Sequence, residues 1–285
     1  MLYDVLGFLP EIPIADWIAN SVDRITTMFS FFFNPFKLHF GNFMDLFSET
    51  LSLIPPVILI LFIAVLAFFA SGKKLGLSIF SVISLWLVYN QGVWDSLIHT
   101  FALVIVASLL SVVIGIPVGI LMSKNRLAES ILTPILDFMQ TMPAFVYLIP
   151  AVAFFGIGMV PGVFASLIFA TPPTVRLTNL GIKQVSSELI EASDAYGSTG
   201  VQKLFKVELP MARESIMAGV NQTIMLALSM VVIASMIGAK GLGMQVLSAL
   251  QRAETGAGFV GGIGIVILAI IMDRFTKSLR TSKDV

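Results

Sequence analysis

Long apolar runs separated by short polar segments make up most of the 285-residue chain. A helix needs about 20 residues to cross a bilayer, and several of the runs reach that length. We predict seven membrane spans, which are Leu51–Ala70, Leu75–Tyr89, Leu97–Met122, Ile131–Phe155, Val160–Val175, Ile216–Ile237 and Gly256–Met272. The second, fifth and seventh are short and require flanking residues, a thinned bilayer or partial burial in protein. An alternative with six spans places the second run in the membrane interface.

The first 50 residues carry a helical repeat of apolar positions and lack the basic start of a signal peptide. One face of the repeat is apolar and consists of Ile14, Trp17, Ile18, Val22, Ile25 and Phe29. After Pro35 the pattern resumes with Phe40, Phe43, Phe47, Leu51 and Ile54. Such stripes are typical of amphipathic helices that lie in the outer membrane interface or across a helical bundle.

A polar segment with helix signals separates the fifth and sixth predicted spans. Ser186 and Ser187 are suited to cap a helix start, and Glu188 and Glu191 fall in the predicted first turn, where the helix dipole favours acids. Gly197 is placed to end this helix in a left-handed conformation. The pattern therefore predicts a short, capped helix inside the polar segment.

A second short helix is predicted over about residues 201–207, and it must end near Pro210. Both helices carry apolar residues among the charges, namely Leu189, Ile190, Ala195, Tyr196, Leu204 and Phe205. An apolar surface of this kind suits a helix that docks into the groove of a partner. The alternative is an ordinary helical loop that packs on its own bundle.

The distribution of basic residues predicts an orientation. With seven spans and the polar segment in the cytoplasm, 13 of the 17 basic residues lie inside: Lys73, Lys74, Lys124, Arg126, Arg176, Lys183, Lys203, Lys206, Arg213, Arg274, Lys277, Arg280 and Lys283. Only Arg24, Lys37, Lys240 and Arg252 remain outside. Cytoplasmic loops are enriched in Lys and Arg, so we predict an external amino terminus and a cytoplasmic carboxyl terminus.

Composition agrees with a membrane protein and excludes several chemistries. Hydrophobic residues make up 57% of the chain, charged residues 12%, and the mean hydropathy is +0.95. The chain has no cysteine, and its two histidines, His39 and His99, are far apart, so we expect no metal site. It lacks a phosphate-binding G-x-x-x-x-G-K-[ST] loop, a catalytic triad pattern and a basic patch with interleaved aromatics. We therefore expect neither catalysis nor nucleic-acid binding by this chain.

Small residues and prolines mark the predicted spans. Two glycine pairs, Gly115 with Gly119 and Gly258 with Gly262, are expected to allow close approach of helices. Prolines interrupt the fourth span at positions 134, 143 and 150, and Pro172 and Pro173 are expected to end the fifth. Broken helices at membrane depth are typical of a translocation path that opens and closes.

Four residues in the fourth span are candidates for such a path. Asp137 is an acid inside an apolar run, and it either gates the path or pairs with a basic loop residue. Pro143 breaks the helix. Phe145 and Tyr147 offer either a cation–π contact to a cationic substrate or plain packing. Between the last two spans, a short helical pattern after Gly238 predicts an external loop that dips toward the pore, receives a delivery protein or is an ordinary surface loop.

The stretch Glu191–Pro210 resembles the EAA motif, E-A-A-x3-G-x9-I-x-L-P, in the cytoplasmic loop of permease subunits of ATP-binding-cassette importers. Glu191, Ala192, Gly197, Leu209 and Pro210 match it with the spacing intact, while Ser193 and Val207 replace an Ala and the Ile. The resemblance implies that this segment couples to an ATPase through Glu191, Ala192, Ser193, Tyr196, Gly197, Leu204, Phe205, Leu209 and Pro210.

A longer resemblance covers about Trp94 to Arg274. LLDFMQTMPAFVYLIPAVAFFGIGMVPG, TPPTVRLTNLGIKQV, GVNQTIMLALSMVVIASMIGAKGLG and GGIGIVILAIIMDR are similar to the permease of glycine betaine/proline importers of the osmoprotectant family. The resemblance implies an all-α, polytopic helical bundle with the type I importer fold in the cell membrane. It also implies a homodimer of the permease, two cytoplasmic ATPases that hold ATP and Mg²⁺, and a separate external binding protein, with no cofactor in this chain.

The expected domain organisation combines both lines of argument. Residues 1–50 form an external amphipathic tail, residues 51–90 two accessory spans, residues 91–275 the transmembrane domain with a cytoplasmic coupling loop at 176–214, and residues 276–285 a cytoplasmic tail. Three alternatives stay open. These are an importer for choline, carnitine or proline, an ion-coupled secondary transporter, and a membrane scaffold or sensor. The sequence does not separate the importers, because the binding protein sets the specificity.

Overall fold

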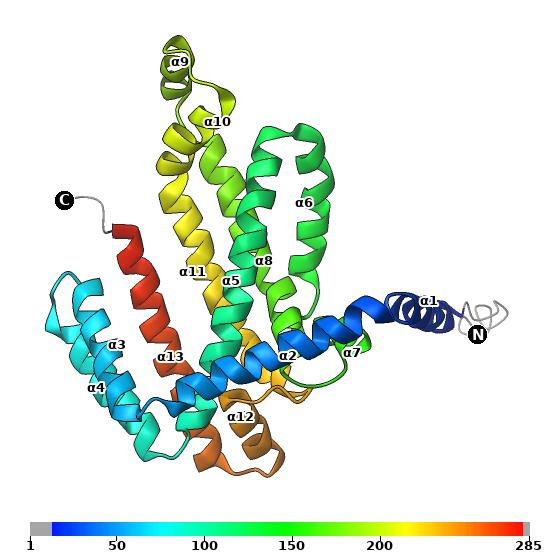
Figure 1. Ribbon diagram of the computed structural model, residues 1–285, viewed down its shortest axis with the longest axis vertical. Helices are drawn as coiled ribbons and strands as arrows, with labels where there is room; N and C mark the ends of the chain where they lie inside the picture. The colour runs from blue at the N-terminus through cyan, green and yellow to red at the C-terminus, as the bar shows by residue number, and fades with distance from the viewer. Residues whose placement is uncertain (1–12, 282–285) are drawn as a thin grey trace, which may run out of the picture.

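The computed structural model describes residues 13–281, and in this part of the chain every regular element is helical. The all-α prediction is therefore confirmed for the described residues. A bundle stands upright in Figure 1, with α1 and α2 lying across it and α9 and α10 protruding at one end. The elements are α1 Ile14–Met28, α2 Ser30–Leu53, α3 Pro56–Ala70, α4 Leu75–Asn90, α5 Trp94–Lys124, α6 Arg126–Thr141, η2 Ala144–Tyr147, α7 Leu148–Phe155, α8 Met159–Lys183, α9 Ser187–Ala195, α10 Gly200–Lys203, η3 Leu204–Glu208, α11 Leu209–Ser235, α12 Leu242–Gln251 and α13 Thr255–Thr281.

The centre of the bundle is α8, which packs between α5 and α11. Gly115 and Gly119 of α5 lie against α8, as the small-residue spacing predicts. A Cβ atom at Gly119 would stand 2.6 Å from the Thr178 Cβ and 2.7 Å from the Val175 carbonyl oxygen. At these two positions the backbones approach to a distance that no larger residue permits, which is the reason small residues pack helices together in membranes.

The prolines of α8 do not end the helix, and the predicted end of the fifth span at Val175 is wrong. Pro172 and Pro173 lie inside a helix that continues to Lys183. Hydroxyl groups of neighbouring helices support the turn before them: Ser111 donates to the Leu167 carbonyl at 3.1 Å, and Thr223 donates to the Ala170 carbonyl at 2.8 Å. Neighbouring helices and hydroxyls commonly compensate for prolines at membrane depth.

The fourth predicted span is not one straight helix. α6 and the η2–α7 pair meet at a break around Pro143 with a bend of 111°. Pro143 has an extended ψ of 137°, and Met142 before it has ψ 135°. The value at Met142 follows from the restriction that proline places on the residue before it. The predicted break at Pro143 is thus confirmed, whereas Pro134 lies inside α6 without interrupting it.

The span count also differs from seven. Among the described residues, four helices are long and apolar enough to cross a membrane, or up to six if each bent pair is one span. The four are α5, α8, the continuous helix from Gly200 to Ser235, and α13. The first predicted span begins at Pro56 rather than Leu51, because α2 and α3 bend by 94° at the Ile54–Pro55 step. α4 is a shorter apolar helix, and it forms a hairpin with α3 beside α13.

The second glycine pair packs differently from the prediction. A Cβ atom at Gly258 would only touch Ala249 at 3.4 Å, and one at Gly262 would meet nothing within 4 Å. Both glycines line an apolar groove of about 880 Å³ between α12 and α13. The close contacts of α13 use Gly261 and Gly264 instead, which face Val246 and Leu242 of α12. The packed glycines therefore lie one residue before and two residues after Gly262, on another face of the same helix.

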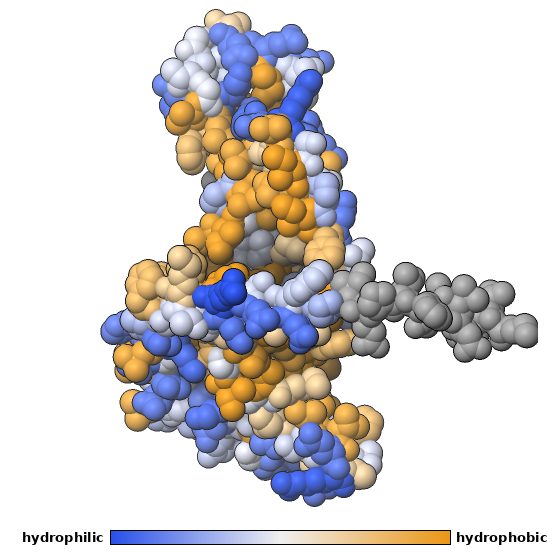
Figure 2. All heavy atoms as spheres, turned by 90° about the vertical axis from the view of Figure 1, so that its right-hand side faces the viewer, coloured by the Kyte–Doolittle hydropathy of each residue, from blue (hydrophilic) through white to orange (hydrophobic). Residues whose placement is uncertain are grey.

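Helices do form in the predicted tail. α1 has no buried residue, and α2 stacks a series of phenylalanines on α7 and α8, with the ring centroids of Phe36 and Phe164 5.5 Å apart. Residues 1–12 of the tail lie outside the described residues. At the other end, α13 extends through Thr281 into the predicted cytoplasmic tail, whose last four residues also lie outside the described part. Figure 2 shows hydrophilic residues gathered over α9 and α10 at one end, and an apolar area between this end and a hydrophilic strip at mid-height.

Candidate coupling site

The protruding segment, which consists of α9, α10 and η3 (residues 187–208), begins with the predicted helix. Ser186 is its N-cap by backbone conformation but makes no side-chain capping bond, and Glu188 is the acid of the first turn. Glu191 lies one turn further on, so its predicted place in the first turn is wrong. Gly197 has a φ of +77°, and Ser198 donates its N–H to the Ser193 carbonyl at 3.1 Å. This left-handed end confirms the prediction for Gly197.

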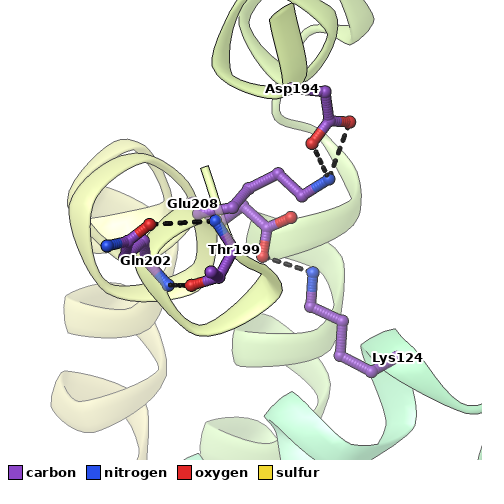
Figure 3. Close-up of polar contacts among 6 residues, drawn as sticks. Lys124, Asp194, Thr199, Gln202 and Glu208 are labelled. Atoms are coloured by element: carbon purple, nitrogen blue, oxygen red, sulfur yellow. Dashed lines mark hydrogen bonds and ion pairs between the residues drawn. The ribbon is translucent and has the colours of Figure 1, made fainter. Parts of the chain in front are cut away.

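Two polar contacts lie near the turn between α9 and α10, one within the start of α10 and one between the two helices (Figure 3). Thr199 and Gln202 form a reciprocal capping box, with N···O distances of 2.9 and 3.3 Å. The Lys203 Nζ donates to both carboxylate oxygens of Asp194 at 2.7 and 2.8 Å. Sequence analysis missed the box, although its signature, a threonine three residues before a glutamine, stands in the sequence. The capping box thus stabilises the start of α10, and the ion pair joins α10 to α9 in a short helical hairpin.

No helix ends at Pro210, contrary to the prediction. η3 is a π-helical turn, and α11 follows it directly, so one helix runs from Gly200 to Ser235. Proline clashes with the carbonyl four residues earlier in an α-helix. For Pro210 that residue is Lys206, which lies inside the wider π turn. The π turn thus accommodates the proline without breaking the helix.

Glu208 is the functional candidate that sequence analysis overlooked. Its side chain is almost fully buried at the base of the protruding segment, and it forms an ion pair with Lys124 at the end of α5 (Figure 3). A signal was present, because Leu204, Glu208 and Ala212 recur every fourth residue on one helix face. An acid in the middle of an otherwise apolar stripe indicates a buried, paired charge.

The predicted coupling residues divide into an outer and an inner set. Tyr196 is 91% exposed and Phe205 is 64% exposed. By contrast, Leu204 and Leu209 pack inward against Ile182, Ala212 and Ile216, so Leu204 is not part of the outer surface. Further positions follow the same division: Leu189 and Val201 are exposed and apolar, and Ser193 is buried. The hairpin therefore presents an apolar, aromatic surface outward and anchors itself with leucines.

The four candidate path residues are not brought into one cluster. Asp137 forms an ion pair with Arg176 at 2.5 Å, and Arg176 lies within α8 rather than in a loop. Tyr147 is buried, donates its hydroxyl hydrogen to the Met139 carbonyl and meets Phe169 edge-on at 5.8 Å, which is a packing role. Phe145 is exposed. In residues 13–281, no three His, Cys, Asp or Glu side chains gather where a metal ion would fit.

A membrane-spanning helical bundle that carries a rigid hairpin with an outward aromatic surface at one end fits a transmembrane subunit of a larger transport complex. The chain belongs to the family of binding-protein-dependent transport system inner membrane components, which matches residues 111–283. It is therefore a multi-pass membrane protein and a permease component of a transport system.

Curated relatives cover nearly the whole chain. The glycine betaine/carnitine transport permease protein of Listeria monocytogenes serotype 1/2a (strain 10403S) is 57% identical over 95% of this chain and 96% of its own length. The glycine betaine transport system permease protein of Bacillus subtilis (strain 168) is 50% identical over 96% and 97%. The glycine betaine/proline betaine transport system permease protein of Escherichia coli (strain K12) is 47% identical over 94% and 75%.

Solved structures support the fold. A chain of the methionine ABC transporter MetNI in an inward-facing conformation superposes with a TM-score of 0.59. Its sequence is 23% identical, and the match covers 69% of this chain and 96% of that chain. At this identity the likeness shows the architecture of a type I importer permease and nothing about the solute.

Proposed function

We propose that this chain is the permease subunit of an ATP-driven importer for glycine betaine or a related compatible solute, and that Tyr196 and Phe205 dock onto an ATPase. The supporting observation is the rigid hairpin itself. Two large aromatic side chains are exposed on a helical hairpin that Leu204 and Leu209 anchor to the bundle. Exposed aromatics on a preorganised element are typical of the anchor residues in interfaces.

The proposed orientation has the hairpin and the carboxyl terminus in the cytoplasm and the amino terminus outside. The end of α5, the start of α6, the end of α8 and the hairpin all lie at one end of the bundle (Figure 1). Lys124, Arg126, Lys183 and Lys203 lie in these four places. Basic residues that collect at one end of the spans favour the cytoplasmic side for that end.

The solute follows from the relatives. The names of all three include glycine betaine, and two of them add carnitine or proline betaine. The remaining parts of the proposed complex are a second copy of the permease, two ATPases that bind ATP and Mg²⁺, and an external binding protein. An importer for choline, carnitine or proline is the nearest rival, because specificity is expected to reside in the binding protein.

The translocation path is proposed along α6 and α8. Asp137 and Arg176 keep parts of their charged groups exposed within the spans, and such residues usually face a water-filled cavity or another subunit. The break at Pro143 allows α6 to move relative to α7. Phe145 is the remaining candidate for a cation–π contact with a quaternary ammonium group, since Tyr147 is occupied by packing.

The docking surface is tested by the double variant Tyr196→Ala/Phe205→Ala. An aromatic anchor commonly contributes at least about 2 kcal/mol to an interface, so we expect more than a tenfold loss of ATPase co-purification and of betaine uptake into proteoliposomes. Leu53→Ala, which also removes an exposed apolar side chain, is the matched control and should change neither. Normal co-purification and uptake by the double variant would show that the hairpin is not the docking site.

Uptake assays in the same proteoliposomes distinguish an ATP-driven importer from an ion-coupled transporter. Uptake that requires the ATPase, ATP and the binding protein supports the importer, and the chain alone should hydrolyse no ATP. Uptake driven by an ion gradient without the ATPase would favour a secondary transporter. Competition of labelled glycine betaine by choline, carnitine or proline identifies the preferred solute.

A further inference from the structure

A buried carboxylate lies at the junction between the protruding segment and the bundle. Glu208 is 4% exposed and is the last residue of η3. Acids are rarely buried to this extent unless a partner neutralises them, because the loss of hydration is costly. A carboxylate at this position therefore requires a partner that neutralises it.

The partner comes from a different helix. Lys124 is the last residue of α5, 84 positions before Glu208 in the chain, and its ammonium group bonds the Glu208 carboxylate. A basic residue in the last turn of a helix also complements the helix dipole. The ion pair therefore links the end of α5 to the base of the hairpin, beside an apolar cluster that includes Leu204 of the hairpin and Ile120 of α5, whereas the backbone links the hairpin to α11.

The turn that carries Glu208 has an unusual geometry. π turns are rare and are found frequently at functional sites. A π turn holds one more residue than an α turn, so its conversion to an α turn would rotate the hairpin relative to α11 by about 100°. Tyr196 and Phe205 would then face a different direction. A contact that fixes this turn therefore fixes the orientation of the docking surface.

The surroundings of the pair are polar and open enough for movement. A cavity of about 360 Å³ adjoins it, lined by Lys124, Glu208, Lys183, Ser187 and Glu191 among others. Glu191 of the motif therefore faces the same cavity as the ion pair, while Tyr196 and Phe205 lie on the outer surface. The junction is thus a charged hinge between the hairpin and the bundle.

We propose that Lys124 and Glu208 are positioning residues that lock the hairpin to α5, so that a force applied by the ATPase moves α5, α8 and α11 together with the hairpin. This proposal rests on the proposed function of the hairpin as the ATPase docking site. Without the ion pair, the π turn rotates under load. ATP hydrolysis then continues, but each cycle moves less solute.

The test compares uptake with ATP hydrolysis in the same proteoliposomes, which contain the full complex with ATPase and binding protein. Lys124→Gln and Glu208→Gln should lower the solute carried per ATP at least about fivefold, the lower end of usual coupling between linked sites. The swapped variant Lys124→Glu/Glu208→Lys should restore the ratio. Lys277→Gln removes a lysine that pairs with Asp273 on α13, away from the hairpin, and should leave the ratio unchanged.

Each outcome decides the proposal. If both single variants carry as much solute per ATP as the wild-type complex, the ion pair does not lock the hairpin to α5. The proposed docking of the hairpin onto the ATPase would be unaffected by that result. If the solute carried per ATP falls in the single variants and does not recover in the swapped variant, the two side chains act through packing rather than through their opposite charges. If the single variants do not assemble, the swapped variant decides: an assembled and coupled complex supports the pair, and a failed one excludes it. Absence of uptake from the wild-type complex would instead refute the proposed function.

Discussion

α6 and α8 run side by side and both contain proline, but they are held by different forces. More than half of the 25 residues of α8 are buried, whereas Leu136 is the one buried residue of α6, whose 16 residues are all described. α8 packs through glycines and hydroxyls. α6 contacts α8 through two ion pairs, Asp137–Arg176 and Glu129–Lys183, and through a small apolar cluster that contains Leu136 of α6 and Val175 of α8. Its exposed residues form an outward apolar stripe of Leu127, Ile131, Ile135 and Phe138.

This difference separates a rigid part of the permease from a movable one. Close-packed interfaces lose many contacts at once when they shift, so α5, α8 and α11 are expected to move as a unit. A partly exposed ion pair contributes only about 0–1 kcal/mol. Two such pairs and one small apolar cluster hold α6 with less buried surface than α8 has, so α6 is expected to move more easily. The outward apolar stripe of α6 is then expected to contact either lipid or a second copy of the chain.

The strongest test of the packed part is Gly119→Ala. The added Cβ would collide with the Val175 carbonyl and the Thr178 side chain, so we expect a loss of about 1–3 kcal/mol or failure to assemble. Gly262→Ala makes the same chemical change in open space and should be neutral or slightly stabilising. Thermal unfolding of the purified proteins measures both. Equal stability of the two variants would show that the position of Gly119 is no more tightly packed than that of Gly262.

A second test removes a buried hydroxyl from the same unit. Thr223 is fully buried, donates to the Ala170 carbonyl and lies 2.8 Å from the Thr174 hydroxyl. Thr223→Val keeps the shape but loses these bonds, so we expect a loss of about 1 kcal/mol. Thr141→Val on exposed α6 is the control. If Thr141→Val lowered stability more than Thr223→Val in the same unfolding assay, α6 rather than α11 would carry the contacts that stabilise the bundle.

The smallest effect on stability is expected at the ion pair of α6. Asp137→Asn removes the charge that binds Arg176 and should change stability by less than about 1 kcal/mol, because the pair is partly exposed. Uptake should nevertheless fall, since the pair lines the proposed path. Strong destabilisation in the unfolding assay would mean that the ion pair, rather than packing, holds α6 in place.

Local signals in the sequence predicted local structure well. Gly197 and the break at Pro143 were predictable because each is set by the φ and ψ that one residue allows. The same reasoning failed at Pro172, Pro173 and Pro210, where close packing with other helices or a π turn accommodates the proline within a continuous helix. Accommodation of this kind depends on neighbours that the linear sequence does not identify.

The candidate site shows the same limit. The motif spacing located the hairpin, and exposure confirmed Tyr196 and Phe205 as surface residues, but the pairing of Lys124 with Glu208 joins residues 84 positions apart. The register of Gly258 and Gly262 was also unpredictable, because a shift of one or two residues decides which glycine meets a partner helix. Contacts between distant segments therefore had to come from the three-dimensional structure.

Hydrogen exchange of backbone amides, measured on the complex in lipid nanodiscs with and without ATP, tests the division into a rigid unit and a movable helix most directly. Peptides from α5, α8 and the inner part of α11 should keep the same slow exchange in both states. Peptides from α6, residues 126–141, should exchange faster and change when ATP binds. Changes in α8 as large as those in α6 would contradict the account, because the hairpin would then have no rigid unit to move.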